Sequence, residues 1–252
     1  MRRTALLLAS TALAVLLASG VALALNTINC DTSVCYGTKR PDLMKGSGGE
    51  NSMFGRGGGD TLKGFGKIDD LQGQGGNDRI LGGPGSDSLQ PGLGDDTLNG
   101  GDGADRYFFL DSNWGNDTIA DPTTNNLVSL QFLPGSTGPV TTRLTSDPAL
   151  PEVTKADGTS TINWDGDVVR DFVGSRNDDT VAGNDDSNYI GDGEFGDTDN
   201  ITGAGGDDEI DVRDGAGDDT VSCGGGTDTV HFDQGDVLIV QGDCESQNPP
   251  RR

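Results

Sequence analysis

Residues 46–108 repeat one pattern of residue types every nine residues, and this period limits what the chain can fold into. The segment divides without a gap into seven nonapeptides such as GGPGSDSLQ, with glycines early, an acidic residue sixth and an apolar residue eighth. The sixth residues are Asn51, Asp60, Asp69, Asp78, Asp87, Asp96 and Asp105. The eighth residues are Met53, Leu62, Leu71, Ile80, Leu89, Leu98 and Tyr107. Such repetition predicts a solenoid, in which each unit buries its apolar residue by stacking on its neighbours.

The chemistry of the nonapeptide predicts a tight turn followed by a short strand. Glycines allow backbone conformations that are closed to residues with a Cβ atom. Such a turn exposes carbonyl oxygens and the sixth residue adds a carboxylate, so together they offer hard oxygen ligands. Calcium accepts such ligands in flexible geometry, whereas magnesium demands a near-ideal octahedron. A flexible Gly/Asp linker is the alternative, but a linker would not keep an apolar residue at every eighth position.

These repeats resemble those of the RTX, or haemolysin-type calcium-binding, repeat proteins. GGPGSDSLQ and GGDGADRYF match that family's pattern at every defined position. The resemblance implies an all-β fold, a right-handed parallel β-roll in which two nonapeptides make one coil and Ca²⁺ lies between stacked turns. One edge would carry Asp60, Asp78 and Asp96, and the other Asn51, Asp69, Asp87 and Asp105. The turn glycines of the two best repeats are candidate carbonyl ligands: Gly83, Gly85, Gly101 and Gly103.

Two of the repeats depart from the family's pattern. In the third nonapeptide, GFGKIDDLQ, Phe65 and Lys67 stand where glycines belong, so we expect its turn to bind calcium poorly. In the first nonapeptide, Asn51 lacks the charge of an aspartate, which weakens the first site.

A second set of acidic-x-apolar steps runs from 179 to 230. The steps are nine residues long, except for two of eleven residues before Ile201 and Val221. The same resemblance makes Asp199, Asp208, Asp219 and Asp228 the candidate ligands of this degenerate array. The alternative is a roll held by strand pairing with little metal.

The charge of the chain restricts its partners. The sequence has 41 acidic and 17 basic residues, a formal net charge of -24 at pH 7. Nucleic acid is excluded as a partner on this basis, because binding it depends on cationic residues. Anionic membranes are disfavoured for the same reason, whereas divalent cations are natural partners.

The first residues, MRRTALLLASTALAVLLASGVALA, have the pattern of a secretion signal. Two arginines precede an apolar run, and Ala22-Leu23-Ala24 supplies a small-residue cleavage pattern, so cleavage is predicted after Ala24. We therefore expect an extracellular protein, secreted or associated with the cell surface. The alternative is an uncleaved membrane anchor, because the run is nearly long enough to span a bilayer.

Four cysteines, Cys30, Cys35, Cys223 and Cys244, all follow the predicted signal. An even number in an exported chain predicts two disulfides. Of the three possible connectivities we favour Cys30–Cys35 and Cys223–Cys244, because each closes a local loop. A zinc site is the alternative, but no CxxC spacing occurs and His231 is the one histidine.

The aromatic-rich segment between the arrays alternates like strands and is broken by Pro and Gly. We expect it to cap the first array and start the second, since solenoids need covered ends. A ligand pocket lined by Trp114 and Trp164 is the alternative. The predicted organisation is a signal at 1–24, an N-terminal cap with a local disulfide at 25–45, a first roll at 46–108, a β-rich cap at 109–173, a second roll at 174–231 and a C-terminal cap and tail at 232–252.

The motifs argue against an enzyme. One histidine excludes an H-E-x-x-H zinc protease, and no G-x-S-x-G elbow occurs. The many carboxylates follow the nonapeptide register, which makes them ligands before catalysts. We predict a non-catalytic, secreted scaffold or surface module that folds on extracellular Ca²⁺. The alternative is a calcium-dependent adhesin or glycan-recognition protein, whose surface partner the sequence does not identify.

Overall fold

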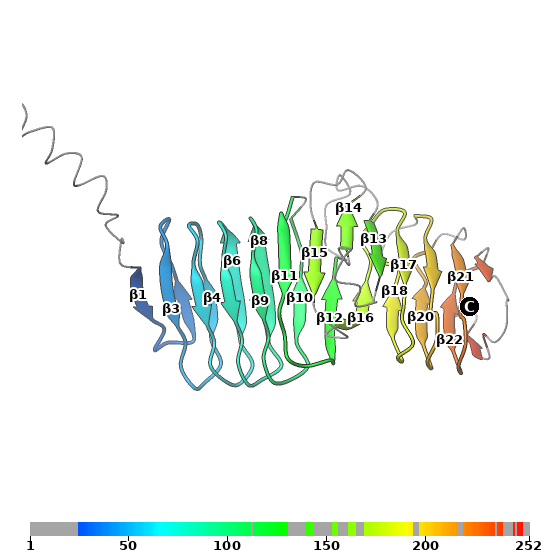
Figure 1. Ribbon diagram of the computed structural model, residues 1–252, viewed down its shortest axis with the longest axis horizontal. Coiled ribbons are helices and arrows are strands. Elements are labelled where there is room, and N and C mark those ends of the chain that lie inside the picture. Colours follow the sequence, from blue (N-terminus) through cyan, green and yellow to red (C-terminus); the bar gives the residue numbers. More distant parts are fainter. Residues whose placement is uncertain are drawn as a thin grey trace, which may run out of the picture.

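The computed structural model describes residues 25–248, apart from 112, 131–139, 144–152, 156–160, 165–168, 194–196, 216–218, 235, 239–243 and 245. The predicted signal segment 1–24 lies outside the described residues. The described part forms strands and turns, without a helix that could cross a membrane. Its strands stack side by side along one long axis, from the N-terminal to the C-terminal end (Figure 1).

The strands form two long sheets, to which successive strands contribute in alternation over most of the chain. The first sheet contains, in spatial order, β1 (Asn26–Asn29), β3 (Asp42–Lys45), β5 (Thr61–Lys63), β7 (Arg79–Leu81), β9 (Thr97–Asn99), β11 (Asn116–Ile119), β15 (Thr161–Trp164), β14 (Val153–Lys155), β13 (Val140–Arg143), β17 (Thr180–Ala182), β19 (Asn200–Thr202), β21 (Thr220–Ser222) and β23 (Val237–Leu238). The second contains β2 (Val34–Tyr36), β4 (Ser52–Phe54), β6 (Asp70–Gly75), β8 (Ser88–Leu93), β10 (Arg106–Phe108), β12 (Asn126–Ser129), β16 (Val169–Val173), β18 (Tyr189–Gly191), β20 (Glu209–Val212), β22 (Thr229–Phe232) and β24 (Ser246–Asn248).

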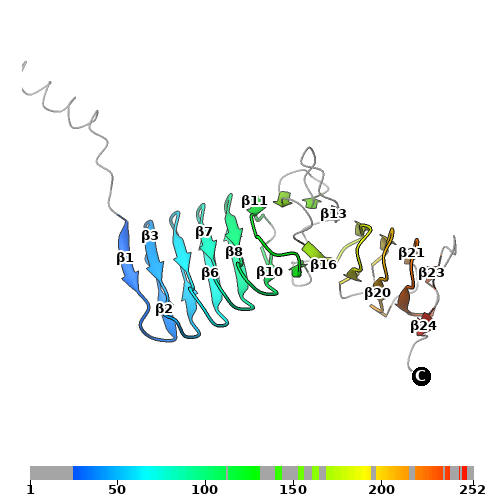
Figure 2. The same ribbon diagram turned by 60° about the horizontal axis from the view of Figure 1, so that its bottom comes forward.

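Neighbouring strands in both sheets are parallel, except where β14 pairs antiparallel with β13 and β15. Within the first array, each strand pairs with the strand one coil later, for example Leu62 with Ile80. One coil therefore consists of two strands and two turns, as Figure 2 shows for the N-terminal coils. The all-β fold and the parallel β-solenoid predicted from the nonapeptides are confirmed.

The core is one residue wide on each sheet. In three-residue strands such as β5 and β9 the middle residue is buried and its neighbours are half-buried, because successive side chains point to opposite faces. That middle residue is the eighth of the nonapeptide. The fully buried positions of this type in the first array are Met53, Leu62, Leu71, Ile80, Leu89, Leu98 and Tyr107. Each coil thus contributes few apolar side chains, and metal or hydrogen bonds must supply further cohesion.

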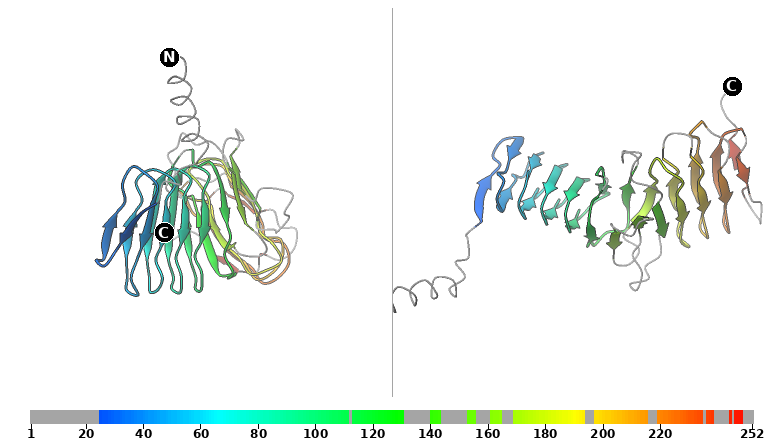
Figure 3. Two further views of the ribbon diagram at one scale, coloured as in Figure 1. Left: turned by 60° about the vertical axis from the view of Figure 1, so that its left-hand side comes forward. Right: turned by 90° about the horizontal axis from the view of Figure 1, so that it is seen from above.

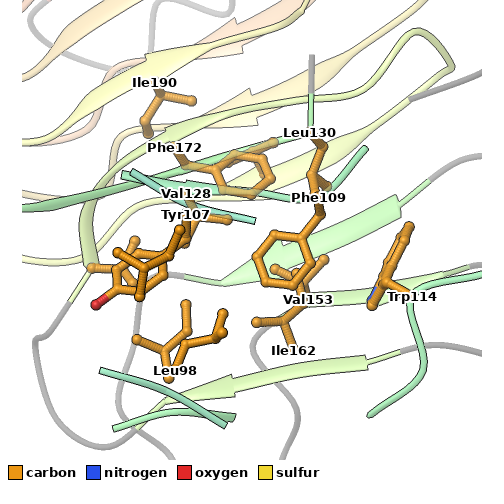
Figure 4. Packing of buried hydrophobic residues seen from close by; sticks show 14 of the residues in the cluster. Leu98, Tyr107, Phe109, Trp114, Val128, Leu130, Val153, Ile162, Phe172 and Ile190 are labelled. Atoms are coloured by element: carbon orange, nitrogen blue, oxygen red, sulfur yellow. The ribbon is translucent and has the colours of Figure 1, made fainter. Parts of the chain in front are cut away.

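The segment between the arrays carries both sheets onward. β11 and β15 extend the first sheet, β12 and β16 extend the second, and β13 and β14 are inserted before β17. Large aromatic side chains fill the core at this junction, including Tyr107, Phe109, Trp114 and Phe172 (Figure 4). The segment predicted to cap the first array and start the second thus continues both sheets from one array into the other.

The junction also bears on the proposed aromatic pocket. Trp114 is fully buried and packs edge-on against Phe109, with 6.3 Å between ring centroids. Trp114 therefore belongs to the core and does not line a surface pocket. The side chain of Trp164 lies outside the described residues.

Both predicted disulfides are present, and each lies near one end of the solenoid. Cys30, directly after β1, pairs with Cys35 in β2, and Cys223, directly after β21, pairs with Cys244 between β23 and β24. Cys30 and Cys223 are buried, so each disulfide extends the core at an end where no further coil covers it.

Candidate metal sites

The sixth residues of the repeats form two hydrogen-bonded ladders, one on each edge of the solenoid. In each rung, the Oδ1 atom of one side chain accepts a hydrogen bond from the backbone N–H of the corresponding residue one coil earlier. For example, Asp78 Oδ1 accepts from Asp60 N at 2.7 Å, and Asp87 Oδ1 accepts from Asp69 N at 2.8 Å. Figure 3 shows the turns aligned along the edges of the stacked coils.

The ladders bring together the residues that the sequence predicted for each edge. The first edge of the first array stacks Asp42, Asp60, Asp78, Asp96 and Asp117. The second edge stacks Asn51, Asp69, Asp87, Asp105 and Asn126. In the second array, the ladders are Asp179, Asp199 and Asp219, and Asn188, Asp208 and Asp228.

The second carboxylate oxygen of most of these aspartates is buried and accepts no hydrogen bond. Among the described residues, no hydrogen-bond donor reaches Oδ2 of Asp60, Asp69, Asp78, Asp87, Asp96, Asp105, Asp199, Asp208 and Asp228. A buried carboxylate oxygen without a partner is costly. The ladders therefore hold rows of oxygen atoms that need a cation.

Burial shifts the protonation of eight of these carboxyl groups. It raises the pKa of each from 3.8, while the ladder N–H lowers it and neighbouring carboxylates raise several further. The raised pKa is about 6 for Asp69, Asp78 and Asp87, about 7 for Asp60, Asp96, Asp105 and Asp208, and about 9 for Asp199. A bound cation would oppose this shift by stabilising the ionised form.

In several repeats, glycine at the first position leaves space beside the Oδ2 atom. A Cβ atom on Gly55 would lie 2.6 Å from Asp60 Oδ2 and 2.8 Å from the carbonyl oxygen of Gly73, one coil later. An aspartate Oδ2 and a carbonyl oxygen of the next coil also converge beside Gly64, Gly73, Gly82 and Gly203. Carboxylate and carbonyl oxygens brought together in this way fit a calcium ion.

The turns keep their shape even where glycine is replaced. Phe65 and Lys67 have φ angles of 81° and 74°, in the left-handed region that Gly83 and Gly101 also occupy with 115° and 104°. The carbonyl oxygens of Phe65 and Lys67 face Gly83 and Gly85 of the next coil. The two substitutions in the third repeat therefore strain the turn without changing its course.

The first turn on each edge of each array is closed by its own backbone. In these turns the side-chain oxygen of the ladder residue accepts a hydrogen bond from the backbone N–H four residues earlier. In the other turns between residues 55 and 105, the corresponding backbone N–H makes no such bond. The four bonds are Thr38 N to Asp42 at 2.6 Å, Ser47 N to Asn51 at 2.8 Å, Ser175 N to Asp179 at 2.5 Å and Asn184 N to Asn188 at 3.0 Å. The sequence named Asn51 as a candidate ligand. In the structure its Oδ1 atom is engaged in this way.

The last turn of the second edge in the first array is closed by side chains of the following coil. The Thr123 hydroxyl lies 3.2 Å from the Gly101 carbonyl oxygen and 3.3 Å from that of Gly103, and it can donate to either. Asp121 Oδ2 accepts hydrogen bonds from Gly100 N and from the Tyr107 hydroxyl. Gly101 and Gly103, two predicted carbonyl ligands, thus face a hydroxyl group that occupies part of the place of a cation.

Three ladder residues were not identified from the sequence: Asp42, Asp117 and Asn126. All three begin the acidic-x-apolar or amide-x-apolar step, as in Asp42-Leu43-Met44. Asp42 precedes Asp60 by one regular coil of 18 residues, whereas Asp117 and Asn126 follow their partners by 21 residues. A search for the step alone, without the glycines, would have found them.

Comparison with known proteins agrees with this geometry. No curated protein matches the chain. A family model for the RTX calcium-binding nonapeptide repeat matches in four copies, at residues 36–62, 63–98, 92–119 and 211–239. These segments contain the ladder residues from Asp42 to Asp117, together with Asp219 and Asp228. The chain is therefore a β-solenoid that contains RTX calcium-binding nonapeptide repeats in these segments.

Proposed function

We propose that the chain is an exported protein whose β-roll folds when it binds Ca²⁺ outside the cell, and that it acts there as a non-catalytic scaffold or surface module. The observation that carries the proposal is the row of buried Oδ2 atoms without a partner in the ladders. Without a cation, their charges oppose folding. With a cation, its binding free energy becomes folding free energy.

Several features support an extracellular site of action. The two disulfides favour an oxidising compartment. Calcium sites of extracellular modules typically have dissociation constants of about 10⁻⁴–10⁻³ M, which suits calcium concentrations outside cells. The N-terminal pattern described above would direct export by the general secretion route.

The test is a calcium titration of the chain from Leu25, with its disulfides intact, followed by far-UV circular dichroism. We expect a cooperative gain of β signal at submillimolar to millimolar Ca²⁺ and none with Mg²⁺ at the same concentrations. A fully folded spectrum in metal-free buffer at neutral pH would contradict the proposal, because strand pairing and disulfides would then suffice.

A second candidate function, recognition of a surface glycan, rests on an exposed aromatic platform near the N-terminal end. Tyr36 is 55% exposed, its ring stacks on Phe54 with 5.1 Å between centroids, and the Arg56 guanidinium lies over it. Flat exposed aromatic faces suit the apolar faces of sugar rings. Binding to a glycan panel in saturating Ca²⁺ tests this function, and Tyr36→Ala should abolish any binding that uses the platform.

A further inference from the structure

Two turns of the second array are longer than a nonapeptide turn and carry acidic residues outside the repeat register. They are the turns of the two eleven-residue steps, before Asp199 and before Asp219. Asp192 directly follows β18, at the place where the preceding turn on this edge has Gly174. Asp214 lies two residues after β20, in the next coil. Neither residue belongs to the ladders.

The stacking of these coils brings three carboxylates together. One carboxylate oxygen from each of Asp192, Asp214 and Asp219 lies within 4.8 Å of the other two. Asp192 is 4% exposed and Asp219 is 1% exposed, whereas Asp214 is half-buried. The Oδ2 atom of Asp192 is buried and, among the described residues, has no hydrogen-bond partner. An unpartnered carboxylate oxygen is thus directed into an acidic cluster.

The surroundings of Asp192 add negative charge. Burial, together with the carboxylates of Asp214, Asp219, Asp211 and Asp197, raises its pKa to about 8. The nearby Arg213 is engaged by Asp211, with 2.5 Å between Nη2 and Oδ2. The cluster therefore gathers like charges that a cation would neutralise.

From this arrangement we infer a divalent-cation site of a second kind, with Ca²⁺ held by the carboxylates of Asp192, Asp214 and Asp219. This site differs from the ladder sites of the proposed function. In the ladders the expected ligands include backbone carbonyl oxygens of glycine turns, whereas here carboxylate side chains of two lengthened turns take their place. Asp219 belongs to both kinds of site, because its Oδ1 atom also accepts the ladder hydrogen bond from Asp199 N at 2.8 Å.

The three carboxylate ligands determine how tightly this site should bind calcium relative to the ladder sites. Three carboxylates provide more negative charge than one aspartate with neutral carbonyl oxygens, and the affinity of calcium sites rises with ligand charge. A cavity of about 440 Å³, lined in part by Tyr189, Asp192 and Arg213, adjoins the site at Asp192. We expect this site to fill before the ladders.

The test uses Asp192→Asn and Asp214→Asn in the full chain, with calorimetric Ca²⁺ titration and thermal unfolding. Each variant should lose the tightest binding class or weaken it by about tenfold or more. At pH 4, where protonation stabilises the metal-free roll, each should melt as wild type does, and at neutral pH in saturating Ca²⁺ each should melt below wild type. Asp186→Asn, which changes an exposed acid in a turn on the opposite edge, is the control and should alter neither quantity.

Two results would overturn the inference. One is a melting temperature that falls equally in metal-free buffer at pH 4 and in saturating Ca²⁺ at neutral pH, which would indicate a structural role. The other comes from wild-type crystals soaked in Tb³⁺, a measurement that needs no variant to fold. Anomalous peaks along the ladders with none between Asp192, Asp214 and Asp219 would overturn this site alone. A peak there with none along the ladders would support this site and overturn the proposed function.

Discussion

At the scale of single residues, the turn at Phe65 and Lys67 shows what the glycines of the repeat contribute. Both residues hold a left-handed backbone although they carry side chains, and both side chains are exposed, so neither gains burial in return. A left-handed conformation costs an ordinary residue roughly 1–2 kcal/mol. Neighbouring coils impose this conformation through the stacked turns.

Replacing either residue by glycine should therefore stabilise the roll. We expect Phe65→Gly and Lys67→Gly each to raise the free energy of unfolding by about 1 kcal/mol, less than the full strain because glycine gains entropy in the unfolded chain. Thermal unfolding in saturating Ca²⁺ measures the change. Ile68→Gly is the matched control, because Ile68 is exposed but has no left-handed backbone, and it should not stabilise. Equal effects at the three positions would contradict this account.

The charge of one ladder aspartate can be removed without removing its hydrogen bond. In Asp78→Asn, the amide oxygen can still accept from Asp60 N, but the charge beside Gly73 is gone. We expect calcium binding at this rung to weaken by about tenfold or more, and the melting temperature in saturating Ca²⁺ to fall. Calorimetric titration and thermal unfolding measure the two effects. Asp70→Asn is the control, because Asp70 is a half-buried residue of β6 outside the ladders, and it should leave calcium affinity unchanged.

At the scale of elements, the arrays are bounded by turns whose oxygen atoms accept hydrogen bonds from nearby groups of the protein. The closed turns at Asp42, Asn51, Asp179 and Asn188 begin each array, and the Asp121–Thr123 turn ends one edge of the first. Hydrogen bonds at these boundaries satisfy oxygen atoms of a kind that other turns leave without a partner among the described residues. We therefore expect cation binding to be confined to the turns that are not closed.

The boundary turn should respond to mutation independently of calcium. Thr123→Val removes a hydroxyl that contacts the carbonyl oxygens of Gly101 and Gly103 and Asp121 Oδ1. We expect a loss of about 1 kcal/mol of stability, typical for one hydrogen bond, with the same size in low and saturating Ca²⁺. Denaturant unfolding at the two concentrations measures it. A loss confined to saturating Ca²⁺ would mean that Thr123 supports a metal site.

Most strands could be predicted from the sequence, because the nonapeptide places an apolar residue in the middle of each one. The exceptions lie where glycine no longer marks the turn. β1 and β2 precede the repeats, and β11 and β12 follow after coils of 21 residues. In these segments an apolar residue still recurs, but its spacing is no longer nine residues, so the sequence predicts capping or linking segments there rather than further coils. Whether Asp60 or Asp199 binds an ion stays a prediction, although both now lie in the expected ladders.

At the scale of the whole molecule, the ladders make folding depend on pH. In the metal-free roll the ladder aspartates from Asp60 to Asp105, together with Asp199 and Asp208, have pKa values of about 6 to about 9, above the ordinary 3.8. Folded protein therefore binds more protons than unfolded protein between these values, so its stability falls as pH rises. Protonation and calcium are alternative ways to neutralise the same oxygens.

We accordingly expect the metal-free protein to be most stable near pH 4 and to lose stability progressively as pH rises through about 6 to 9. Calcium affinity should change in the opposite direction and increase over the same range, because the ligands must be ionised. Circular dichroism melts in metal-free buffer and calcium titrations at several pH values test both. Metal-free stability that increases from pH 5 to pH 8 would contradict the ladder electrostatics.

The regular 18-residue rung spacing within the first array has a consequence for how such a molecule can change its size. Each coil contacts only the coils before and after it, so duplication of one coil leaves every other contact intact. A duplicated segment such as 73–90 would lengthen the solenoid by about 4.8 Å, the spacing of adjacent strands, and add one rung to each edge. Each duplication of eighteen residues would therefore increase the length of the solenoid and its number of candidate calcium ligands in a fixed ratio.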